Sequence, residues 1–382
     1  MKNKILYFGK MDFPFNNASA CRVMGVCSAL IKEDFECFAY GHTKGEIFDG
    51  NVDNIAYHND IYPKNLFQYL FTFGKKKNIK RVLDEFNSDE IAAIFFTSIG
   101  HRQLKYLGKW CNKNRIPLIF DCGDINRHST KHFLYKIISS MEFKMFNRCV
   151  RKYASVMAIS SYIYEMFNKK CFYTFKVPCI TDKQSARFDV KPSNDVDTTK
   201  MNVGYFGVPG KNFIKDRLDW CLTAFKELNR DDISFYVGGI KESELPEQFR
   251  GIPNVKYLGP ISNKECISIT KQLDYVVFYR PDNEITRAGF ASKVTEAFAC
   301  NVPVMTNITS DLKTYLNEHN SLTVESFEYE GCKELFDGLS KTDKSDIQKM
   351  KSYIERNDEL GSQKWGSIIK ENILAIQKKL NS

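Results

Sequence analysis

The sequence lacks the patterns that mark several classes of protein. Its 12 cysteines stand singly, with no Cys-x-x-Cys pair, and only six histidines are present, so we expect neither a structural zinc site nor a disulfide framework. A G-x-G-x-x-G motif is absent, which removes the main fingerprint of a dinucleotide-dependent oxidoreductase. No apolar run approaches the roughly 18 residues needed to cross a bilayer, and the N-terminal run is too short for a signal peptide. These absences favour a protein of the reducing cytoplasm.

Length and composition predict an α/β protein with two cores. At 382 residues the chain exceeds one compact core, and a composition that is 43% hydrophobic and 14% aromatic can fill two. Short apolar stretches alternate with segments of helical periodicity, as in parallel sheets joined by helices, so we predict two Rossmann-like doubly wound domains. The expected strands are 5–8, 36–40, 92–96, 117–120 and 156–159 in the first domain, and 203–206, 233–237, 255–258, 275–278 and 302–306 in the second.

Three segments divide the chain. We assign residues 1–176 to the first domain, 177–361 to the second, and 362–382 to a C-terminal helix. The stretch 183–200 is rich in Asp, Ser and Lys, so we interpret it as a linker or a mobile surface segment. Apolar residues recur with a helical period over 363–380, which predicts one long helix with an apolar face.

The most informative stretch is 275–307, which has the pattern of a buried strand, a charged loop, a helix and another strand. Arg280 and Arg287 supply two guanidinium groups to the loop, and Gly289 permits a tight turn before a helix that should start near residue 291 or 292. Lys293 follows directly. Free backbone N–H groups, the helix dipole and these cations together predict a site for phosphate or pyrophosphate.

Glu296 lies about one turn into the same helix. A carboxylate at this place is suited to accept hydrogen bonds from a ribose diol, as acidic residues do in nucleotide-binding folds. The alternative is an ordinary helix whose Lys293 and Glu296 share a solvated face. Spacing alone leaves both interpretations open.

The segment AGFASKVTEAFACNVPV resembles the donor site of GT-B glycosyltransferases, in particular the retaining family 4. The resemblance implies a GT-B fold, in which two Rossmann-like domains face a central cleft and the C-terminal helix crosses back to the first domain. The matching residues are Gly289, Phe290, Lys293, Glu296, Pro303 and Val304.

The resemblance also implies roles for these residues. Glu296 would hold the ribose of a nucleotide sugar, and the backbone from Gly289 through Phe290 and Ala291 to Ser292 would cradle phosphate or the transferred sugar. The family usually carries another glutamate eight residues before Glu296. That position is Ala288 here, and Glu284 is a substitute that could reach the same space.

A second loop supports a phosphate site. The strand 201–206 runs into Gly207, and Lys211 and Lys215 precede an amphipathic helix. This stretch resembles the first strand–helix loop of the family's C-terminal domain, in which a lysine meets the pyrophosphate, and Lys215 is the better match. An arginine that many members carry nearby is absent; Lys211 would substitute for it without the bidentate fork.

The acceptor side is expected in the first domain. The resemblance places Asn17, Ser19 and Arg22 near donor phosphate and acceptor, although a surface or intradomain ion pair fits Arg22 equally well. Two aspartates follow the strand 117–120, at the sheet edge where ligands bind, and either could contact a sugar hydroxyl or the attacking acceptor; an Asx turn with a helix cap is the alternative. The two aspartates are Asp121 and Asp124. Two histidines, His128 and, more weakly, His101, are candidates for the same contact with sugar or acceptor.

The basic excess is local. Residues 101–176 contain 15 Lys or Arg against 4 Asp or Glu, although the whole chain carries a net charge of +9. Within them, 130–153 predicts a basic amphipathic helix, which would either lie on an anionic membrane surface or pack as an ordinary Rossmann helix with a wet basic side. The region lacks a nucleic-acid-binding motif, so we do not expect nucleic acid as a partner.

Together these patterns and the resemblance predict a glycosyltransferase that moves a sugar from a UDP or GDP sugar to a hydroxyl of a glycan or lipid-linked acceptor. Lys215 and Lys293 would stabilise the departing diphosphate electrostatically, without an obligatory metal or other cofactor. The resemblance implies retention of configuration, and fold and charge suggest surface polysaccharide or glycolipid assembly at the inner face of the membrane. The alternatives are a non-catalytic GT-B subunit that binds sugar or stabilises a partner, and a GT-B nucleotide-sugar epimerase.

Overall fold

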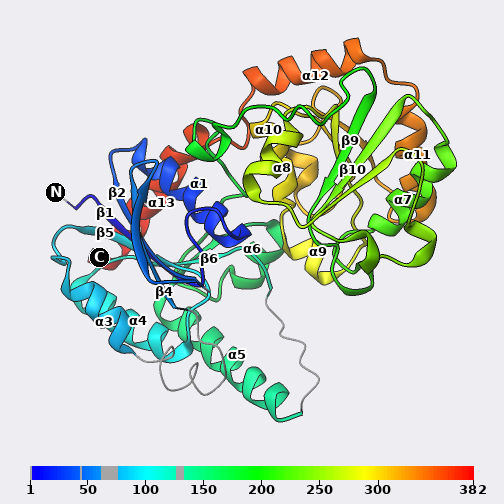
Figure 1. The fold of residues 1–382 in the computed structure, drawn as a ribbon. Coiled ribbons are helices and arrows are strands. Elements are labelled where there is room, and N and C mark those ends of the chain that lie inside the picture. Colours follow the sequence, from blue (N-terminus) through cyan, green and yellow to red (C-terminus); the bar gives the residue numbers. More distant parts are fainter. Residues whose placement is uncertain (1, 44, 62–75, 126–132) are drawn as a thin grey trace. The chain divides into compact units, whose positions relative to one another are not determined.

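The computed structural model describes residues 2–43, 45–61, 76–125 and 133–382, which form two compact units (Figure 1). The first unit consists of residues 1–182 and 362–382, and the second of 183–361. Each is built on one sheet of mainly parallel strands joined by helices. The predicted α/β class with two Rossmann-like sheets is confirmed.

The sheet of the first unit has the order β3-β4-β2-β1-β5-β6-β7-β8, in which only the β3–β4 pair is antiparallel. The order reverses direction between β1 and β5, so the loops after these two strands flank the crevice where ligands bind in such sheets. The described elements are β1 Lys4–Phe8, α1 Ala18–Ile31, β2 Glu36–Thr43, β3 Phe48–Val52, β4 Ile55–Ile61, α3 Lys76–Asp84, β5 Ile91–Phe96, α4 His101–Asn114, β6 Leu118–Cys122, α5 Phe133–Tyr153, β7 Ser155–Ala158, α6 Ser161–Phe167, β8 Thr174–Lys176 and α13 Ser362–Asn381.

The sheet of the second unit has the order β11-β10-β9-β12-β13-β14 and is parallel throughout. Its order reverses between β9 and β12. The elements are η2 Ala186–Phe188, β9 Met201–Phe206, η3 Lys211–Phe213, α7 Leu218–Leu228, β10 Ile233–Gly238, η4 Glu242–Glu244, η5 Glu247–Phe249, β11 Val255–Gly259, α8 Asn263–Thr270, β12 Tyr275–Phe278, α9 Glu284–Ala288, α10 Ser292–Ala299, β13 Val304–Asn307, η6 Leu312–Thr314, β14 Ser321–Val324, α11 Tyr329–Leu339 and α12 Lys344–Arg356, where η marks a 3₁₀ helix.

All ten expected strands are present, and the structure adds four that the apolar pattern did not reveal. Strands β8 and β14 are short edge strands, and β3 and β4 form a hairpin with many polar residues. The hairpin turns at Asp53 and Asn54, whose φ angles of 52° and 62° suit the tight turns that match the twist of paired strands. Three of the four added strands, β3, β8 and β14, are edge strands, which bury less surface and so have shorter hydrophobic runs.

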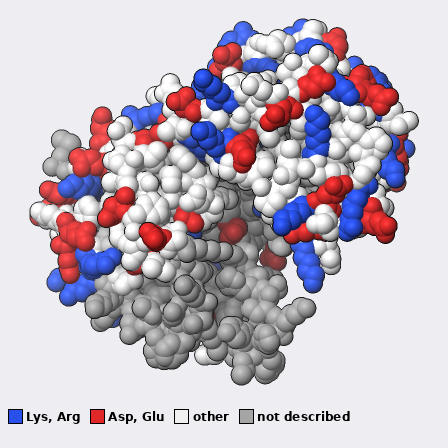
Figure 2. All heavy atoms as spheres, viewed as in Figure 1, with Lys and Arg blue, Asp and Glu red and all other residues white. Residues whose placement is uncertain are grey.

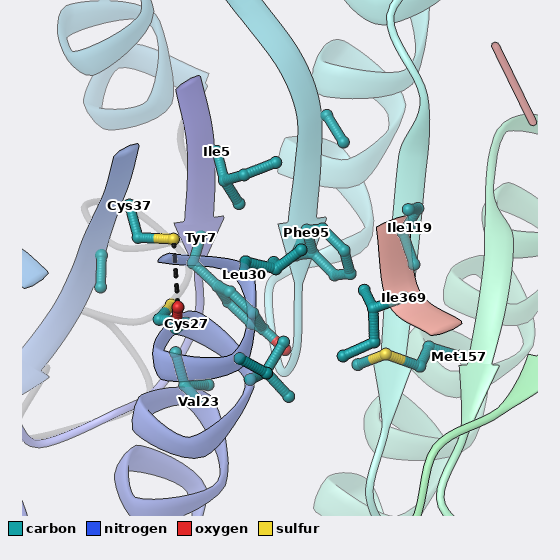
Figure 3. Close-up of a cluster of buried hydrophobic side chains, with 14 of the residues drawn as sticks. Ile5, Tyr7, Val23, Cys27, Leu30, Cys37, Phe95, Ile119, Met157 and Ile369 are labelled. Atoms are coloured by element: carbon teal, nitrogen blue, oxygen red, sulfur yellow. Dashed lines mark hydrogen bonds between the residues drawn. The ribbon is translucent and has the colours of Figure 1, made fainter. Parts of the chain in front are cut away.

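Helix α13 completes the core of the first unit. Its residues Ile369, Ile373 and Ile376 are fully buried in the same cluster as residues of α1 and β1, and Ile369 lies near the central strands in Figure 3. A Cβ atom on Gly366 would lie 2.4 Å from the carbonyl oxygen of Ala29, so this glycine permits the close approach of α13 to α1.

The segment 183–200 corrects an expectation. It belongs to the second unit and packs on α8, since the Lys271 ammonium donates to the carbonyl oxygens of Phe188 and Val190 at 2.7 and 2.8 Å. Phe188 and Val196 are buried. The interpretation of 183–200 as a linker or a mobile surface segment is therefore wrong: the stretch is part of the second unit, and its few apolar residues anchor it.

Helix α5 carries apolar side chains on its surface. Phe146 packs edge-on against Phe96 and Phe120 of the sheet, as in a Rossmann helix, but Met141, Phe143 and Met145 are exposed beside several basic residues. The expected helix 130–153 is described from residue 133, and its side chains from residue 140. On the face shown in Figure 2, acidic and basic side chains are interspersed. Within the described residues, no helix is long and apolar enough to cross a membrane.

Candidate functional site

The candidate site of the second unit lies where its strand order reverses. Strand β9 ends at Phe206 and β12 ends at Phe278, and the loops that follow them carry the predicted phosphate-binding residues. In a parallel sheet, the carboxyl ends of these neighbouring strands meet at the same edge, next to the starts of the following helices. The site is therefore built by two loops and the start of α10.

The loop after β9 brings its backbone close to Lys293. Gly207 has a φ angle of 141°, and a Cβ atom there would lie 3.2 Å from the Lys293 Nζ atom, so a side chain would press on the ammonium group. Lys211 and Lys215 are exposed on the same loop, with Lys211 opening the 3₁₀ helix η3. The structure thus brings together the predicted Gly207, from the loop after β9, and Lys293, from the start of α10.

The segment after β12 is partly helical, whereas the sequence predicted a loop. It contains the short helix α9, whose N-cap Asn283 accepts hydrogen bonds from the N–H groups of Ile285 and Thr286. The exposed Arg287 pairs with Asp282 at 3.1 Å. The capping residue explains why a segment expected to be loop becomes helical.

Helix α10 starts at Ser292, within the range expected. Its N-cap is Ala291, whose side chain offers no hydrogen-bond acceptor to the first N–H groups of the helix. Ala291 and Phe290 are buried, and the Phe290 ring packs edge-on against Tyr315. The turn from Gly289 to Ser292 is therefore fixed by packing, and the start of α10 keeps the partial positive charge of an uncapped helix end.

A buried charge cluster lies beneath these loops. The carboxylate of Asp216 accepts hydrogen bonds from Lys293 Nζ at 2.7 Å and from the Tyr205 hydroxyl at 3.0 Å, and its other oxygen lies 3.6 Å from Arg280 Nε. The Arg280 and Lys293 side chains are only 4% and 14% exposed. We call Asp216, Lys293, Arg280 and Tyr205 the Asp216 cluster.

The Asp216 cluster has more positive than negative charge. Burial alone raises the pKa of Asp216, but the neighbouring Lys293 and Arg280 outweigh it, so the pKa lies below its ordinary value and the group is a carboxylate at neutral pH. Two cations therefore face one anion. Within the described residues, Arg280 Nη1 is buried with no hydrogen-bond partner. A buried unpaired donor beside an excess positive charge favours an anionic ligand.

Glu296 occupies the next turn of α10 and has a partner that the sequence did not reveal. Its Oε1 atom lies 2.8 Å from Nη2 of Arg187, which belongs to the 183–200 segment. Asp216 is the other residue whose role was missed. Since 77 and 109 residues separate Asp216 from Lys293 and Arg187 from Glu296, no local pattern signals either pair.

The first unit holds a comparable buried pair. Arg22 on α1 and Asp121 on β6 form an ion pair of 2.7 Å, and the Tyr7 hydroxyl also donates to Asp121. The Arg22 guanidinium further donates to the carbonyl oxygens of Pro178 and Val177 at 2.7 and 3.2 Å. We call this set the Asp121 network.

The Asp121 network shows which partners Arg22 and Asp121 have in the structure. Both side chains are buried, and the guanidinium is bonded to a carboxylate and two carbonyl groups. These contacts join α1, β6 and the chain at 177–178. An ion pair was one of the alternatives for Arg22, and the structure contains one within the first unit; a ligand contact of Arg22 or Asp121 stays a prediction.

The other acceptor-side candidates lie in different surroundings. Asn17 caps α1 by accepting a hydrogen bond from the Ala20 N–H at 2.8 Å, and Ser19 is exposed in the first turn of that helix. Asp124 is exposed after β6. His101 is buried against Glu142, with its Nδ1 atom 2.5 Å from the carboxylate. His128 lies outside the described residues.

Comparisons with known proteins agree with the fold. Residues 201–334 match the model of the protein family described as glycosyl transferases group 1. No curated protein matches the chain. Similar solved structures include a sucrose-phosphate synthase from Thermosynechococcus elongatus, with a TM-score of 0.67 and 10% identity over 98% of this chain and 100% of that one.

Two other similar structures carry a ligand. Anabaena HepE in complex with UDP has a TM-score of 0.65 and 13% identity over 97% of this chain and 100% of that one. A UDP-forming α,α-trehalose-phosphate synthase from Burkholderia xenovorans, in complex with glucose-6-phosphate, has a TM-score of 0.67 and 8% identity over the same shares of the two chains. At these identities the likeness shows the fold, which confirms the GT-B prediction. The family match covers the part of the second unit that contains the Asp216 cluster and Glu296.

Proposed function

We propose that the chain is a glycosyltransferase that takes its donor, a nucleoside-diphosphate sugar, at the second unit. The observation that carries the proposal is the Asp216 cluster, in which the buried Arg280 and the partly buried Lys293 share one carboxylate at the strand-order reversal and beside the uncapped start of α10. This is the environment that a diphosphate requires. The match of residues 201–334 to glycosyl transferases group 1 supports the same assignment.

UDP is the first candidate for the donor nucleotide. The Anabaena protein binds UDP and the Burkholderia synthase is UDP-forming, and both share the fold of this chain. A GDP sugar stays an alternative, since cations and backbone amides bind either diphosphate. The proposal assigns the ribose to Glu296 and the phosphates to Lys293, Lys215 and the turn from Gly289 to Ser292, with Lys211 and Arg287 at the rim.

The proposed reaction exchanges one bond at the anomeric carbon. An acceptor hydroxyl forms a new carbon–oxygen bond there, the bond to the diphosphate breaks, and the hydroxyl proton leaves with the phosphate or with a nearby base. Lys293, Arg280 and the N–H groups of α10 would stabilise the charge that develops on the departing diphosphate. No obligatory metal is proposed. The resemblance to retaining family 4 enzymes supports attack from the face that the diphosphate leaves.

The proposed acceptor is a glycan or a lipid-linked glycan, in surface polysaccharide or glycolipid assembly. The exposed Met141, Phe143 and Met145 of α5, beside Lys144 and Arg148, support a membrane-surface role, because apolar groups with flanking basic residues bind anionic lipid surfaces. Asn17, Ser19 and Asp124 are the proposed acceptor-side residues. This setting would place the protein at the cytoplasmic face of a membrane.

A non-catalytic sugar-binding subunit is the second candidate. One observation favours it. Where the family usually carries a glutamate, eight residues before Glu296, this chain has the fully buried Ala288. Such a protein would bind a donor without turning it over in the presence of any acceptor.

A thermal-shift screen tests the proposal. Purified protein is melted with UDP, GDP, CMP and dTDP, each with and without its common sugars, because a ligand that binds only the native state raises the midpoint. A clear shift with one diphosphate supports the donor site and selects the donor for acceptor assays. If none of them shifts the midpoint, the donor site is refuted.

A further inference from the structure

We propose that Arg187 positions Glu296 for the ribose of the donor nucleotide. The inference rests on the proposed function and adds to it a residue from outside both phosphate-binding loops. Arg187 would not touch the nucleotide. It would fix the direction of the Glu296 carboxylate and compensate its charge.

The contacts of Arg187 define one conformation. Its Nη2 atom donates to Glu296 Oε1 at 2.8 Å, and its Nε atom donates to the side-chain oxygen of Asn263 at 3.0 Å, at the start of α8. The guanidinium also lies over the Phe188 ring, with 5.3 Å from its central carbon to the ring centroid. An arginine held at two nitrogen atoms and one face cannot rotate freely, so its bond fixes the carboxylate as well.

The backbone of Arg187 is also held. Ser185 caps the 3₁₀ helix η2 by accepting a hydrogen bond from the Arg187 N–H at 3.2 Å, and Lys271 fastens the residues that follow to α8. The Arg187 side chain is 5% exposed, whereas that of Glu296 is 27% exposed. The pair therefore has a buried cationic side and an open anionic side.

The open side of Glu296 suits a diol. Oε1 is engaged by Arg187, and within the described residues Oε2 has no hydrogen-bond partner. A carboxylate oxygen accepts more than one hydrogen bond, so Oε2 can accept from the two ribose hydroxyl groups. A flexible glutamate would lose rotamer freedom on binding, and Arg187 removes that cost in advance.

Arg187 also solves a charge problem. Glu296 lies three residues after Lys293, which is about 4.5 Å along the helix axis. An uncompensated carboxylate so close to the phosphate-binding residues would repel the diphosphate it is meant to help bind. The Arg187 guanidinium neutralises this carboxylate from the side away from solvent.

The test compares UDP with 2′,3′-dideoxy-UDP by isothermal titration calorimetry. GDP and its dideoxy analogue replace them if GDP is the diphosphate that binds. The wild-type protein is expected to bind the ribose form at least about tenfold more tightly, as hydrogen bonds to a charged group suggest. Arg187→Met is expected to weaken binding of the ribose form and to reduce that ratio to about twofold, while Arg187→Lys, which keeps the charge, gives an intermediate ratio.

Lys271→Met is the matched control, because it loosens the same segment without touching Glu296. It should change both affinities equally and leave the ratio intact. Circular dichroism and the melting midpoint show whether each variant is folded, and Arg187→Gln serves if Arg187→Met is not. An unchanged ratio in a folded Arg187 variant overturns the positioning role alone, whereas a wild-type protein that binds no diphosphate overturns the donor site itself, and this inference with it.

Discussion

Each unit buries an aspartate beside an arginine and a tyrosine, but the two clusters differ in their charge balance. In the Asp121 network, one guanidinium meets one carboxylate and two carbonyl groups. In the Asp216 cluster, one carboxylate meets both a lysine and an arginine, and Arg280 Nη1 has no partner within the described residues. A buried ion pair alone does not identify a binding site. The proposed donor site rests instead on the surplus positive charge and the unpaired donor.

The largest expected effect is on the stability of the first unit. Asp121→Ala leaves the Arg22 charge buried and uncompensated, which should cost about 3–5 kcal/mol of unfolding free energy. Urea denaturation measures the loss, and hydrogen exchange of the β6 amides assigns it to this unit. The control is Arg22→Met with Asp121→Leu, which removes both charges and should restore most of the stability. A loss below about 1 kcal/mol in Asp121→Ala contradicts the structural role.

Mild acid should lower the stability of the first unit before that of the second. Burial lowers the pKa of His42 in the first unit to about 4, against an ordinary value of 6.5. The contribution of neutral His42 to the free energy of unfolding is therefore complete above pH 6.5. It is lost as the pH falls toward 4, because the unfolded chain binds the proton first, and the whole contribution is about 3 kcal/mol. The lowered pKa of Asp216 places the corresponding loss in the second unit below pH 3.8.

Urea denaturation between pH 7 and 4 measures this difference. His42→Gln keeps a donor for the Gly9 carbonyl oxygen, which lies 2.9 Å from His42 Nδ1, but cannot titrate. The variant should lose the slope of stability with pH between 6.5 and 4. The expectation fails if its slope equals that of the wild-type protein.

Arg280→Met should affect binding more than stability. Arg280 is buried with one nitrogen unpaired, and Lys293 still neutralises Asp216 in the variant, so the melting midpoint should change little. Loss of a charge-assisted contact should weaken UDP binding by about 2 kcal/mol, or roughly thirtyfold. The control is Arg230→Met, which removes an exposed arginine paired with Asp232 in the same unit. If the Arg280 and Arg230 variants bind UDP with equal affinity, Arg280 does not contact the diphosphate.

Glu296→Ala should have the smallest of these effects. It removes the acceptor of the ribose hydroxyl groups but leaves the Asp216 cluster in place, so we expect about a tenfold loss of UDP affinity. The variant should stay folded, but its melting midpoint should fall because the buried Arg187 loses its carboxylate partner. Calorimetric titration of the folded variant measures this loss. An unchanged dissociation constant would show that Glu296 does not hold the ribose.

The sequence was sufficient for the fold class and for the two loops of the donor-side candidate site. Central strands, the start of α10 and the apolar face of α7 are local patterns, and Leu218, Cys221, Leu222 and Phe225 are all buried as the helical period predicts. Gly207 and Lys293 were each identified from their own loop. Their proximity follows from the neighbouring positions of β9 and β12 in the sheet.

The rest depends on contacts between distant parts of the chain. Asp216 resembles many polar residues at a helix start until Lys293 and Arg280 approach it. Arg187 lies in a stretch whose composition suggests a linker, and only the packing of Phe188 and Lys271 shows that the stretch is anchored. The polar composition of a segment does not reveal that a single buried residue, such as Phe188, fixes its position.

The first unit is discontinuous in sequence, and this has a consequence for the order of folding. Its core needs the isoleucines of α13, which are translated only after the whole of residues 183–361, whereas the second unit is one continuous stretch. During synthesis the second unit can therefore complete its core first, whereas α1 cannot pack against α13 until the end of the chain has been made. A chain that stops at residue 361 is expected to leave 183–361 resistant to protease and residues 1–182 open to cleavage.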